Sequence, residues 1–315
     1  MQLNIRETAL NLGYIDAKPI TGHPFDVWLN RIKGTHLEGL SVMHDPAKVT
    51  GWPINEITLW AAITPSPPIE GWPDGCCEIG AHYMALTASR TRRAAWQDAV
   101  TAMGYEIKKD AFLPDRAAAI RAGLGVHGLN GLMIAPNHGS FVDITVLAVR
   151  STPPKEARGP EHDLSPGCSK CGACIAACPN GAISENGVDT QRCLRHYMSK
   201  PDQLPEEDYH KMGRRFLGCD TCQLACPSNA GLKQEQPSKE IIESMMLEKL
   251  LTNPSMDSVS KGFPHSKEWM QAQGALAAAN MGRKDLLPLV EALVGSEDEQ
   301  LCKRAQWAVN RLRQI

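Results

Sequence analysis

The sequence predicts an α+β protein, and three features of the chain support this prediction. Residues 1 to about 150 alternate helical patterns with short apolar strands, which is typical of helices layered on a sheet. Residues 168–227 are rich in cysteine and in turn-forming residues. The chain beyond Glu235 has the periodicity of short helices. We therefore expect three domains, at residues 1–155, 156–235 and 236–315.

The first domain is expected to contain clearly bounded helices and strands. Thr21 and Pro24 can begin a short helix that runs to Ile32. Residues 57–63 form an apolar run typical of a buried strand, which a proline-rich loop closes. Further elements follow in order: a long helix at 80–103 that ends at Gly104, a helix at 114–122, and strands at 132–135 and 141–150.

The rest of the chain has a different character. Residues 151–166 contain four prolines and mixed charge, and they are expected to be a linker. A last helix can begin at Glu297 or Asp298, with one apolar stripe of Leu301, Ala305, Ala308 and Leu312. Paired short helices of this kind resemble a HEAT-like unit. So few repeats must pack on the preceding domain to bury their apolar face.

Composition limits the function classes. The formal net charge is −2, so no global field attracts nucleic acid or anionic lipid. The first seven residues contain no apolar segment typical of a signal peptide, and no run is apolar enough to cross a bilayer. We expect a cytoplasmic protein without a membrane partner. In a reducing compartment, cysteines at fixed spacing indicate a metal site or catalysis.

The strongest pattern in the sequence is a pair of cysteine motifs. The first is Cys168-x2-Cys171-x2-Cys174-x3-Cys178-Pro179, and the second is Cys219-x2-Cys222-x3-Cys226-Pro227, with Cys193 between them. In runs of this kind three thiolates bind one [4Fe–4S] cluster, and the fourth binds the neighbouring cluster. Zinc, the main alternative, favours separated pairs of cysteines or histidine ligands. The sequence therefore predicts a ferredoxin-like domain with two [4Fe–4S] clusters.

The crossed pattern assigns ligands to each cluster. One cluster takes Cys168, Cys171, Cys174 and Cys226, and the other takes Cys219, Cys222, Cys178 and Cys193. Of the remaining thiols, Cys302 is expected in core packing and Cys76-Cys77 in packing or at the surface. Two clusters in series form an electron path, for which ferredoxin or flavodoxin is the expected donor.

Several segments together resemble one known family. They are Arg116-Ala117-Ala118-Ala119, Arg121-Ala122-Gly123-Leu124-Gly125, Gly128 with Asn130, Gly139-Ser140, and Gly218-Cys219-Asp220-Thr221-Cys222-Gln223. These segments and the cysteine motifs are similar to those of the epoxyqueuosine reductases, and more distantly to reductive dehalogenases. The resemblance implies a nitroreductase-like cobalamin domain, a two-cluster domain, a HEAT-like tail and a cobalamin-dependent reduction that completes queuosine in transfer RNA.

The resemblance also implies a corrinoid site. The glycines at 123, 125, 128 and 131 would let backbone approach a flat macrocycle, although a set of ordinary turns is the alternative. Asn130 and Ser140 can donate hydrogen bonds to its amide arms. His127 can bind cobalt or transfer protons, or can simply be hydrogen-bonded in a turn. Further positions expected near the cofactors are Gly139, Asp220 and Thr221.

The proton donor is open at this point. The proton-donating aspartate of the family falls on Lys109 when the segments are aligned without a gap, and Asp110 follows one residue later. A carboxylic acid beside an apolar macrocycle can have a raised pKa and donate a proton. Tyr83 is the one residue kept from an aspartate–tyrosine–histidine group of the family, and it is the third candidate.

Two other functions compete with the reductase. The chain can be a non-catalytic electron-transfer or corrinoid-reducing protein, or a transfer-RNA-binding module with structural clusters. Transfer RNA would require local basic patches, because the net charge is slightly negative. The candidates are Arg90, Arg92, Arg93, Arg192, Arg195, Lys211, Arg214, Arg215, Lys303, Arg304, Arg311 and Arg313.

Overall fold

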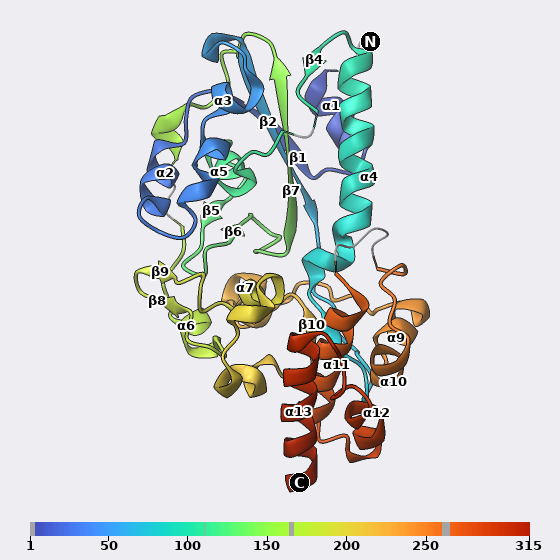
Figure 1. Ribbon diagram of the computed structural model, residues 1–315. Coiled ribbons are helices and arrows are strands. Elements are labelled where there is room, and N and C mark those ends of the chain that lie inside the picture. Colours follow the sequence, from blue (N-terminus) through green and yellow to red (C-terminus); the bar gives the residue numbers. More distant parts are fainter. Residues whose placement is uncertain (1–3, 110, 164–166, 260–264) are drawn as a thin grey trace. The chain divides into compact units, whose positions relative to one another are not determined.

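The computed structural model describes residues 4–109, 111–163, 167–259 and 265–315. The chain divides into two units, one made of residues 1–66 and 88–171 and the other of residues 67–87 and 172–315. Figure 1 labels their helices and strands.

The first unit is built on a four-stranded sheet. Its strand order is β1 (Asp16–Thr21), β2 (Ile57–Pro65), β7 (Val142–Arg150) and β4 (Glu106–Ile107), and neighbouring strands are antiparallel. The strands expected at 57–63 and 141–150 are confirmed as the two central ones. The sequence pattern does not predict the two edge strands β1 and β4.

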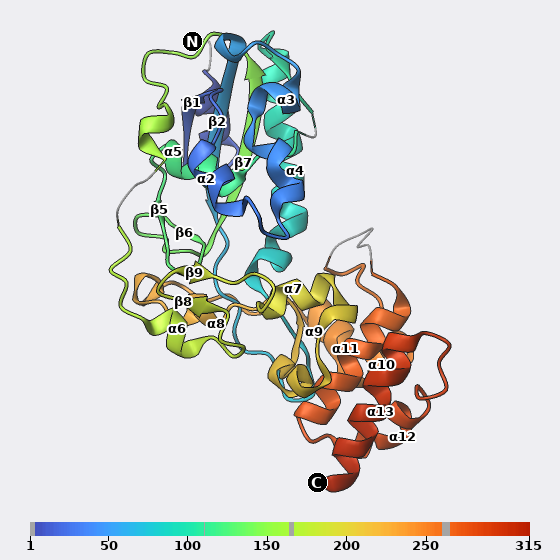
Figure 2. The same ribbon diagram turned by 60° about the vertical axis from the view of Figure 1, so that its left-hand side comes forward.

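Helices cover both faces of this sheet (Figures 1 and 2). One face buries Leu59, Ala61 and Ile63 of β2 against helix α5 (Asp115–Arg121) and helix α2 (Asp26–Ile32). The opposite face buries Ala62 against α1 (Ile5–Asn11) and α4 (Ala81–Ala102). The alternation follows from the two-residue period of a strand. The remaining short elements are η1 (Glu38–His44), α3 (Pro46–Thr50) and η2 (Ile54–Glu56).

A short hairpin follows α5 in the first unit. Its strands are β5 (Val126–His127) and β6 (Met133–Ile134), and His127 lies opposite Met133. The hairpin carries most of the glycine-rich segment that was expected to bind a cofactor.

The expected linker is wrong over most of its length. The backbone N–H of Thr21 donates to the carbonyl oxygen of Arg158 at 3.0 Å, so this segment runs beside the edge strand β1. Helix η3 (Pro160–His162) follows. Asp163 is then held by Arg121 in a buried ion pair, with 2.6 Å between Nε and Oδ1. Residues 151–163 are therefore a packed part of the first unit.

In the second unit, short elements carry the cysteine motifs. β3 (Glu78–Ile79) pairs in parallel with β10 (Arg215–Leu217), and α6 (Ala173–Ala177) packs against α8 (Thr221–Leu224). The other elements of this part are β8 (Ile183–Ser184), β9 (Gly187–Val188), α7 (Leu194–Ser199), η4 (Pro201–Gln203), η5 (Glu206–Met212) and η6 (Pro227–Asn229).

The C-terminal helices share one core with the cysteine-rich part. They are α9 (Lys239–Met245), α10 (Leu247–Thr252), α11 (Lys267–Asn280), η7 (Lys284–Leu286), α12 (Leu287–Glu291) and α13 (Glu299–Gln314). Leu250, Ala275 and Val309 from these helices pack in the same cluster as Tyr209 and Phe216. The expectation that the helical tail buries its apolar face on the preceding residues is confirmed.

Within the described ranges, every helix is too short or too polar to traverse a lipid bilayer.

Candidate iron–sulfur and cofactor site

Four cysteines of the second unit lie close together. The thiols of Cys219 and Cys178 both affect the pKa of Cys193. The thiols of Cys178, Cys193 and Cys219 all affect the pKa of Cys222. Burial is the largest cause, and together with these neighbours it raises the pKa of Cys222 to about 12. Such thiols lose their protons readily only when a metal centre compensates the charge. The donor set therefore fits a cluster.

The two cysteine loops meet through their helices. Cys174 lies on α6 and Cys222 on α8, and these two helices pack against each other. Cys226 follows α8 directly. The arrangement brings the first motif against the second, as ligand exchange between two clusters requires. Cys168 and Cys171 belong to the other unit.

Glycines let a third segment approach the second cysteine loop. The backbone N–H of Gly80 donates to the carbonyl oxygen of Leu217 at 2.8 Å. Gly218 has φ +85°, and a Cβ atom there would lie 2.9 Å from the Tyr83 ring. Only glycine satisfies both the backbone angle and the contact. Tyr83 is therefore fixed beside Cys219.

Asp220 and Thr221 hold this junction together. The Asp220 carboxylate accepts hydrogen bonds from the Ala81 backbone at 2.7 Å and from Gln223 Nε2 at 2.9 Å. Burial raises the pKa of Asp220. Arg215 Nη2 donates to Thr221 Oγ1 at 2.8 Å. Both residues were expected near a cofactor, and both have partners inside the protein.

Tyr83 is paired with a cation. The guanidinium carbon of Arg195 lies 5.2 Å from the centre of the Tyr83 ring, and burial raises the pKa of the phenol despite this neighbour. The Cys193 thiol is among the groups that act on the phenol. Tyr83 is thus the one proton-donor candidate that the described structure places beside a cluster thiol. Arg195 was considered only as an RNA contact, although its position two residues after Cys193 could have indicated a role near the cluster.

Close contacts inside the protein explain the glycines of the glycine-rich segment. A Cβ atom at Gly125 would lie 2.6 Å from the Ile134 carbonyl oxygen, and one at Gly128 would lie 2.7 Å from Asn130 Oδ1. Gly123 has φ +71° and is covered by the Arg158 guanidinium. Hairpin and helix-end packing therefore explain these glycines, and their presence alone does not indicate a cofactor.

The polar residues of the same segment are largely engaged. Asn130 is buried, and its Oδ1 accepts from the Leu132 backbone at 3.2 Å. Gly139 pairs with Ala135 in an isolated bridge, and Ser140 is buried beside it. The amide nitrogen of Asn130 is the polar atom of this group for which the described residues supply no hydrogen-bond partner.

His127 offers an available ring. It packs edge-on against Trp28, with 4.9 Å between ring centres. Burial, followed by the charges of Arg31 and Arg116, lowers the pKa of His127 to about 4. The imidazole is therefore neutral at physiological pH, with no hydrogen-bond partner among the described residues. The buried Nε1 of Trp28 also lacks an acceptor in the described part of the chain. A neutral imidazole beside an unsatisfied donor fits the polar periphery of a bound cofactor.

Lys109 and Asp110 are the two neighbouring candidates for the proton donor. Lys109 is largely exposed, and its ammonium lies 3.8 Å from Asp98 on α4. Asp110 lies outside the described residues.

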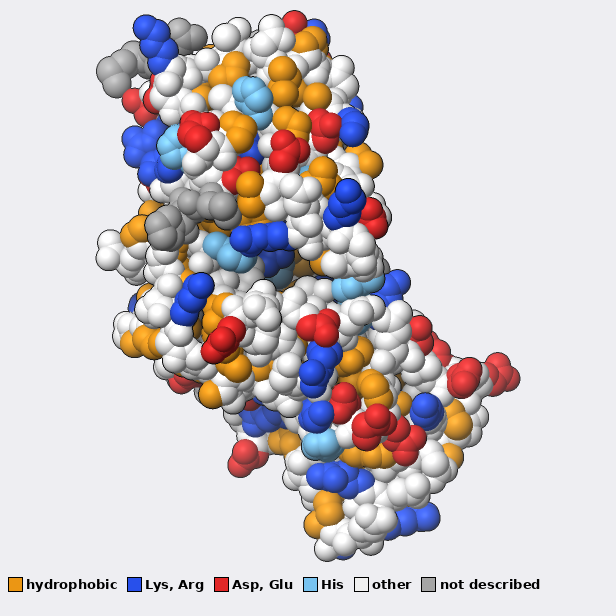
Figure 3. All heavy atoms as spheres, turned by 90° about the vertical axis from the view of Figure 1, so that its left-hand side faces the viewer, with side chains coloured by type: hydrophobic (Ala, Val, Ile, Leu, Met, Phe, Trp, Pro, Cys, Tyr) orange, Lys and Arg blue, Asp and Glu red, His pale blue; other side chains and the backbone are white. Residues whose placement is uncertain are grey.

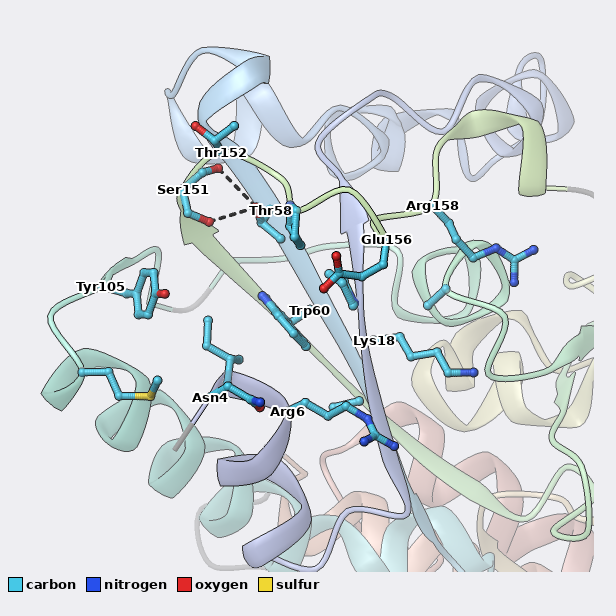
Figure 4. A pocket seen from close by; sticks show the side chains of 16 residues that line it. Asn4, Arg6, Lys18, Thr58, Trp60, Tyr105, Ser151, Thr152, Glu156 and Arg158 are labelled. Carbon is cyan, nitrogen blue, oxygen red and sulfur yellow. Dashed lines mark hydrogen bonds between the residues drawn. The ribbon is translucent and has the colours of Figure 1, made fainter. Parts of the chain in front are cut away.

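A hollow of about 750 Å³ lies in the first unit around the edge strand β1. Figure 4 shows Trp60 on one side of that strand and Lys18 and Arg158 on the other. None of the residues that the sequence singled out for a site lines it. Two of its three cations, Arg6 and Lys18, pair with Asp16.

Most of the expected RNA-binding cations are also engaged. Arg304 is 1% exposed and donates to Gln273 and to the Pro201 carbonyl oxygen, so it cannot reach a phosphate without unfolding. Lys211 pairs with Asp208, and Arg214 pairs with Glu78. Figure 3 shows Lys and Arg side chains interspersed with Asp and Glu on one face. The expectation of an RNA contact is therefore wrong for Arg304, and it stays a prediction for Lys211 and Arg214.

The three cysteines outside the motifs are buried or half-buried. Cys76 and Cys77 are fully buried, and the Cys302 thiol donates to the Val294 carbonyl oxygen at 3.0 Å. Cys302 is half-buried and lies outside the hydrophobic core clusters of the described residues, so its expected place in core packing is wrong.

Comparison with known proteins identifies the cysteine-rich part. The family of 4Fe-4S double cluster binding domains matches residues 167–229. Epoxyqueuosine reductase of Staphylococcus aureus (strain NCTC 8325 / PS 47) is 31% identical over 212 residues, which are 64% of this chain and 54% of that protein. Over this part the chain is similar to epoxyqueuosine reductases. The matched part spans about half the length of such relatives.

Solved epoxyqueuosine reductases share the fold. The enzyme from Bacillus subtilis, solved with its catalytic aspartate loop swung out of the active site, has a TM-score of 0.80 at 22% identity and covers 97% of this chain and 88% of its own. An epoxyqueuosine reductase bound to an epoxyqueuosine-modified tRNA-Tyr stem loop has a TM-score of 0.75 at 22% identity, with the same coverage. The resemblance to epoxyqueuosine reductases, the mixed α/β fold and the double-cluster domain are confirmed.

Proposed function

We propose that this chain is an oxidoreductase of the epoxyqueuosine reductase type, which carries electrons through two [4Fe–4S] clusters to a bound corrinoid and reduces an epoxide-bearing nucleoside of transfer RNA. The gathering of the half-buried residues Cys178, Cys193, Cys219 and Cys222, whose thiols lie close enough to act on one another, is the observation that carries the proposal. Burial and the neighbouring thiols raise the pKa of Cys193 and of Cys222, and a metal cluster bound at this group would stabilise the deprotonated thiolates.

The domain roles follow from the same observation. The unit of residues 1–66 and 88–171 would be the nitroreductase-like corrinoid and substrate domain, and the unit of residues 67–87 and 172–315 would contain most of the ferredoxin-like domain and the HEAT-like tail. Cys168, Cys171, Cys174 and Cys226 would hold the first cluster. A ferredoxin or flavodoxin would supply single electrons to these clusters.

His127 supports the corrinoid part of the proposal. A bound corrinoid would supply a strongly reducing, two-electron nucleophile. His127 is neutral and its ring nitrogens lack partners among the described residues, so it can bind cobalt or accept a hydrogen bond without first losing a proton. The amide nitrogen of Asn130 and the Nε1 of Trp28 can donate to the amide arms of the macrocycle.

We assign the proton donation to Asp110 in preference to Lys109. The side chain of Lys109 is largely exposed, and its ammonium lies 3.8 Å from the Asp98 carboxylate on α4. The relative from Bacillus subtilis carries its catalytic aspartate on a loop that can leave the active site, and Asp110 is the carboxylic acid one residue after the position that the family resemblance gives to the proton donor. Tyr83, with its raised pKa, is the second candidate.

A cobalamin titration tests the corrinoid part. Anaerobically purified protein with both clusters is mixed with cobalamin, and the visible spectrum is recorded. A shifted spectrum is expected for the wild type, and a different shift for His127→Ala if the ring binds cobalt. An unchanged wild-type spectrum would contradict corrinoid binding. Lys233→Ala, at an exposed position of the second unit, serves as the matched control.

The substrate needs a separate test. Transfer RNA from a strain that lacks the last queuosine step is incubated with the protein, cobalamin and a reductant, and its nucleosides are then analysed. Loss of epoxyqueuosine is expected, together with a strong decrease in rate for Asp110→Asn and a small one for Lys109→Met. Persistent epoxyqueuosine with a cobalamin-loaded wild type would show that the substrate differs.

A further inference from the structure

Arg195 is held between Tyr83 and a cysteine ligand. Its backbone N–H donates to the Cys193 sulfur, and its side chain bonds to the Tyr83 phenol. The guanidinium carbon lies 5.2 Å from the centre of the Tyr83 ring, and Nη1 donates to Ser199 Oγ at 2.5 Å. A side chain fixed at these contacts has little freedom to move its charge away from the thiols.

Tyr83 itself is fixed over the second cysteine loop. Its ring is at the contact distance that excludes any side chain at Gly218, the residue before Cys219. The backbone N–H of Gly218 also donates to Met198 Sδ at 3.0 Å, which anchors that backbone from its other side. The pair of Tyr83 and Arg195 is therefore part of the wall around the thiols of Cys193 and Cys219.

The positive charge of the Arg195 guanidinium is not neutralised by an ion pair within the described residues. No carboxylate forms an ion pair with Arg195 among the ion pairs found in the described ranges. The Asp220 carboxylate, the acidic group of this loop, accepts hydrogen bonds from the Ala81 backbone and from Gln223, and Arg215 and His82 lie near it. His265 is the other titratable side chain that Arg195 affects.

We propose that Arg195 is a positioning residue that holds Tyr83 and sets the reduction potential of the cluster bound by Cys178, Cys193, Cys219 and Cys222. Reduction adds one electron to an already anionic cluster, so a fixed positive charge nearby stabilises the reduced form and raises the potential. This inference rests on the cluster assignment of the proposed function. It does not depend on the corrinoid or on transfer RNA.

The test is a potentiometric titration of the cluster-loaded full chain, followed by electron paramagnetic resonance, without cobalamin or RNA. Arg195→Gln is expected to shift one of the two midpoint potentials to a more negative value. A roughly tenfold change in the reduction equilibrium corresponds to about 59 mV. The other cluster keeps its potential. Arg195→Lys keeps the charge and is expected to shift that potential much less.

Arg311→Gln is the matched control. Arg311 also stacks on an aromatic ring, at 5.5 Å from the centre of the Trp307 ring on the exposed side of α13. The Arg311→Gln substitution removes the same charge and the same kind of aromatic contact, but far along the chain from the cysteine motifs. Both reduction potentials are therefore expected to stay unchanged.

Three outcomes would overturn the proposal: unchanged potentials in Arg195→Gln, equal shifts of both clusters, or equal shifts in Arg195→Gln and Arg195→Lys. If Arg195→Gln does not assemble its clusters, Tyr83→Phe decides. This variant removes the phenol bond to Arg195, so it should move the same single potential, and no movement would contradict the proposal. Wild-type protein that holds zinc or fewer than two clusters would instead refute the cluster assignment.

Discussion

The Asp220 carboxylate accepts a hydrogen bond from the backbone N–H of Ala81 at 2.7 Å, which ties the start of the long helix α4 to the second cysteine loop. Asp220 lies between the ligand candidates Cys219 and Cys222. A side chain that satisfies a helix N-terminus therefore also fixes the backbone on which two cluster thiols are carried.

Asp220→Ala should lower the stability and the cluster content together. Loss of a hydrogen bond to a charged group costs about 1.5–3 kcal/mol, measurable as the free energy of unfolding of the apo protein in urea. Iron content and electron paramagnetic resonance should show selective loss of one cluster. Ser238→Ala removes the cap of α9, where Ser238 Oγ accepts from the Ile241 backbone, and should leave both clusters intact. Full cluster content in Asp220→Ala would contradict the structural link.

The ion pair of Arg121 and Asp163 should dominate the stability of the first unit. Both side chains are buried, and Arg121 also donates to the carbonyl oxygens of His23 and Pro24. Arg121→Gln leaves the Asp163 carboxylate buried and unpaired, at a cost of about 3–5 kcal/mol in unfolding free energy. Arg6→Gln breaks an exposed pair with Asp16 and should cost at most about 1 kcal/mol. Equal losses in urea denaturation of the two variants would refute this.

His127 should titrate near pH 4 in the folded protein, as followed by NMR of its imidazole. Its pKa is lowered to about 4 by burial and by Arg31 and Arg116. Between this pH and its ordinary value of 6.5, the unfolded chain binds a proton that the folded chain does not, so His127 lowers the stability as the pH falls through this range. Arg31→Gln should raise the pKa. A folded-state pKa near 6.5 would contradict the burial.

The crossed ligand assignment predicts paired phenotypes. Cys178→Ser, Cys193→Ser and Cys219→Ser should each perturb one and the same cluster signal in electron paramagnetic resonance. Cys174→Ser and Cys226→Ser should perturb the other signal, because the last cysteine of each motif serves the opposite cluster. Cys302→Ser should keep the full iron content, since that thiol bonds to the Val294 carbonyl oxygen. If Cys174→Ser and Cys178→Ser perturb the same signal, the crossing is wrong.

Gly125→Ala separates two explanations for the glycine-rich segment. The added Cβ would lie 2.6 Å from the Ile134 carbonyl oxygen and 2.7 Å from Met133 Cγ, so the apo protein should lose about 1–3 kcal/mol of stability. Gly39→Ala meets nothing within 4 Å and is the control. Unchanged apo stability with lost cobalamin binding would mean that this glycine serves the cofactor and not the hairpin.

The cysteine motifs and the main apolar segments were predictable because each is a local property of the chain. The spacing of Cys168 to Cys178 and the run at 57–63 depend on neighbours only a few residues away. The same holds for the last helix, which begins after the cap Asp298 and ends at Gln314. Edge strand β1 was missed because it is short, contains Pro19, and exists through its pairing with β2.

The amino-acid sequence by itself determined which residues can bind metal and which segments are apolar. Cysteine spacing and hydrophobic periodicity depend only on residues that are close together in the sequence. Only the tertiary structure decided which of these side chains are available. Arg121 forms an ion pair with Asp163, 42 positions away, and Arg195 contacts the Tyr83 ring. Arg304 is buried, and Lys109 pairs with Asp98. Such pairings depend on how distant segments pack, and a one-dimensional pattern does not contain that information.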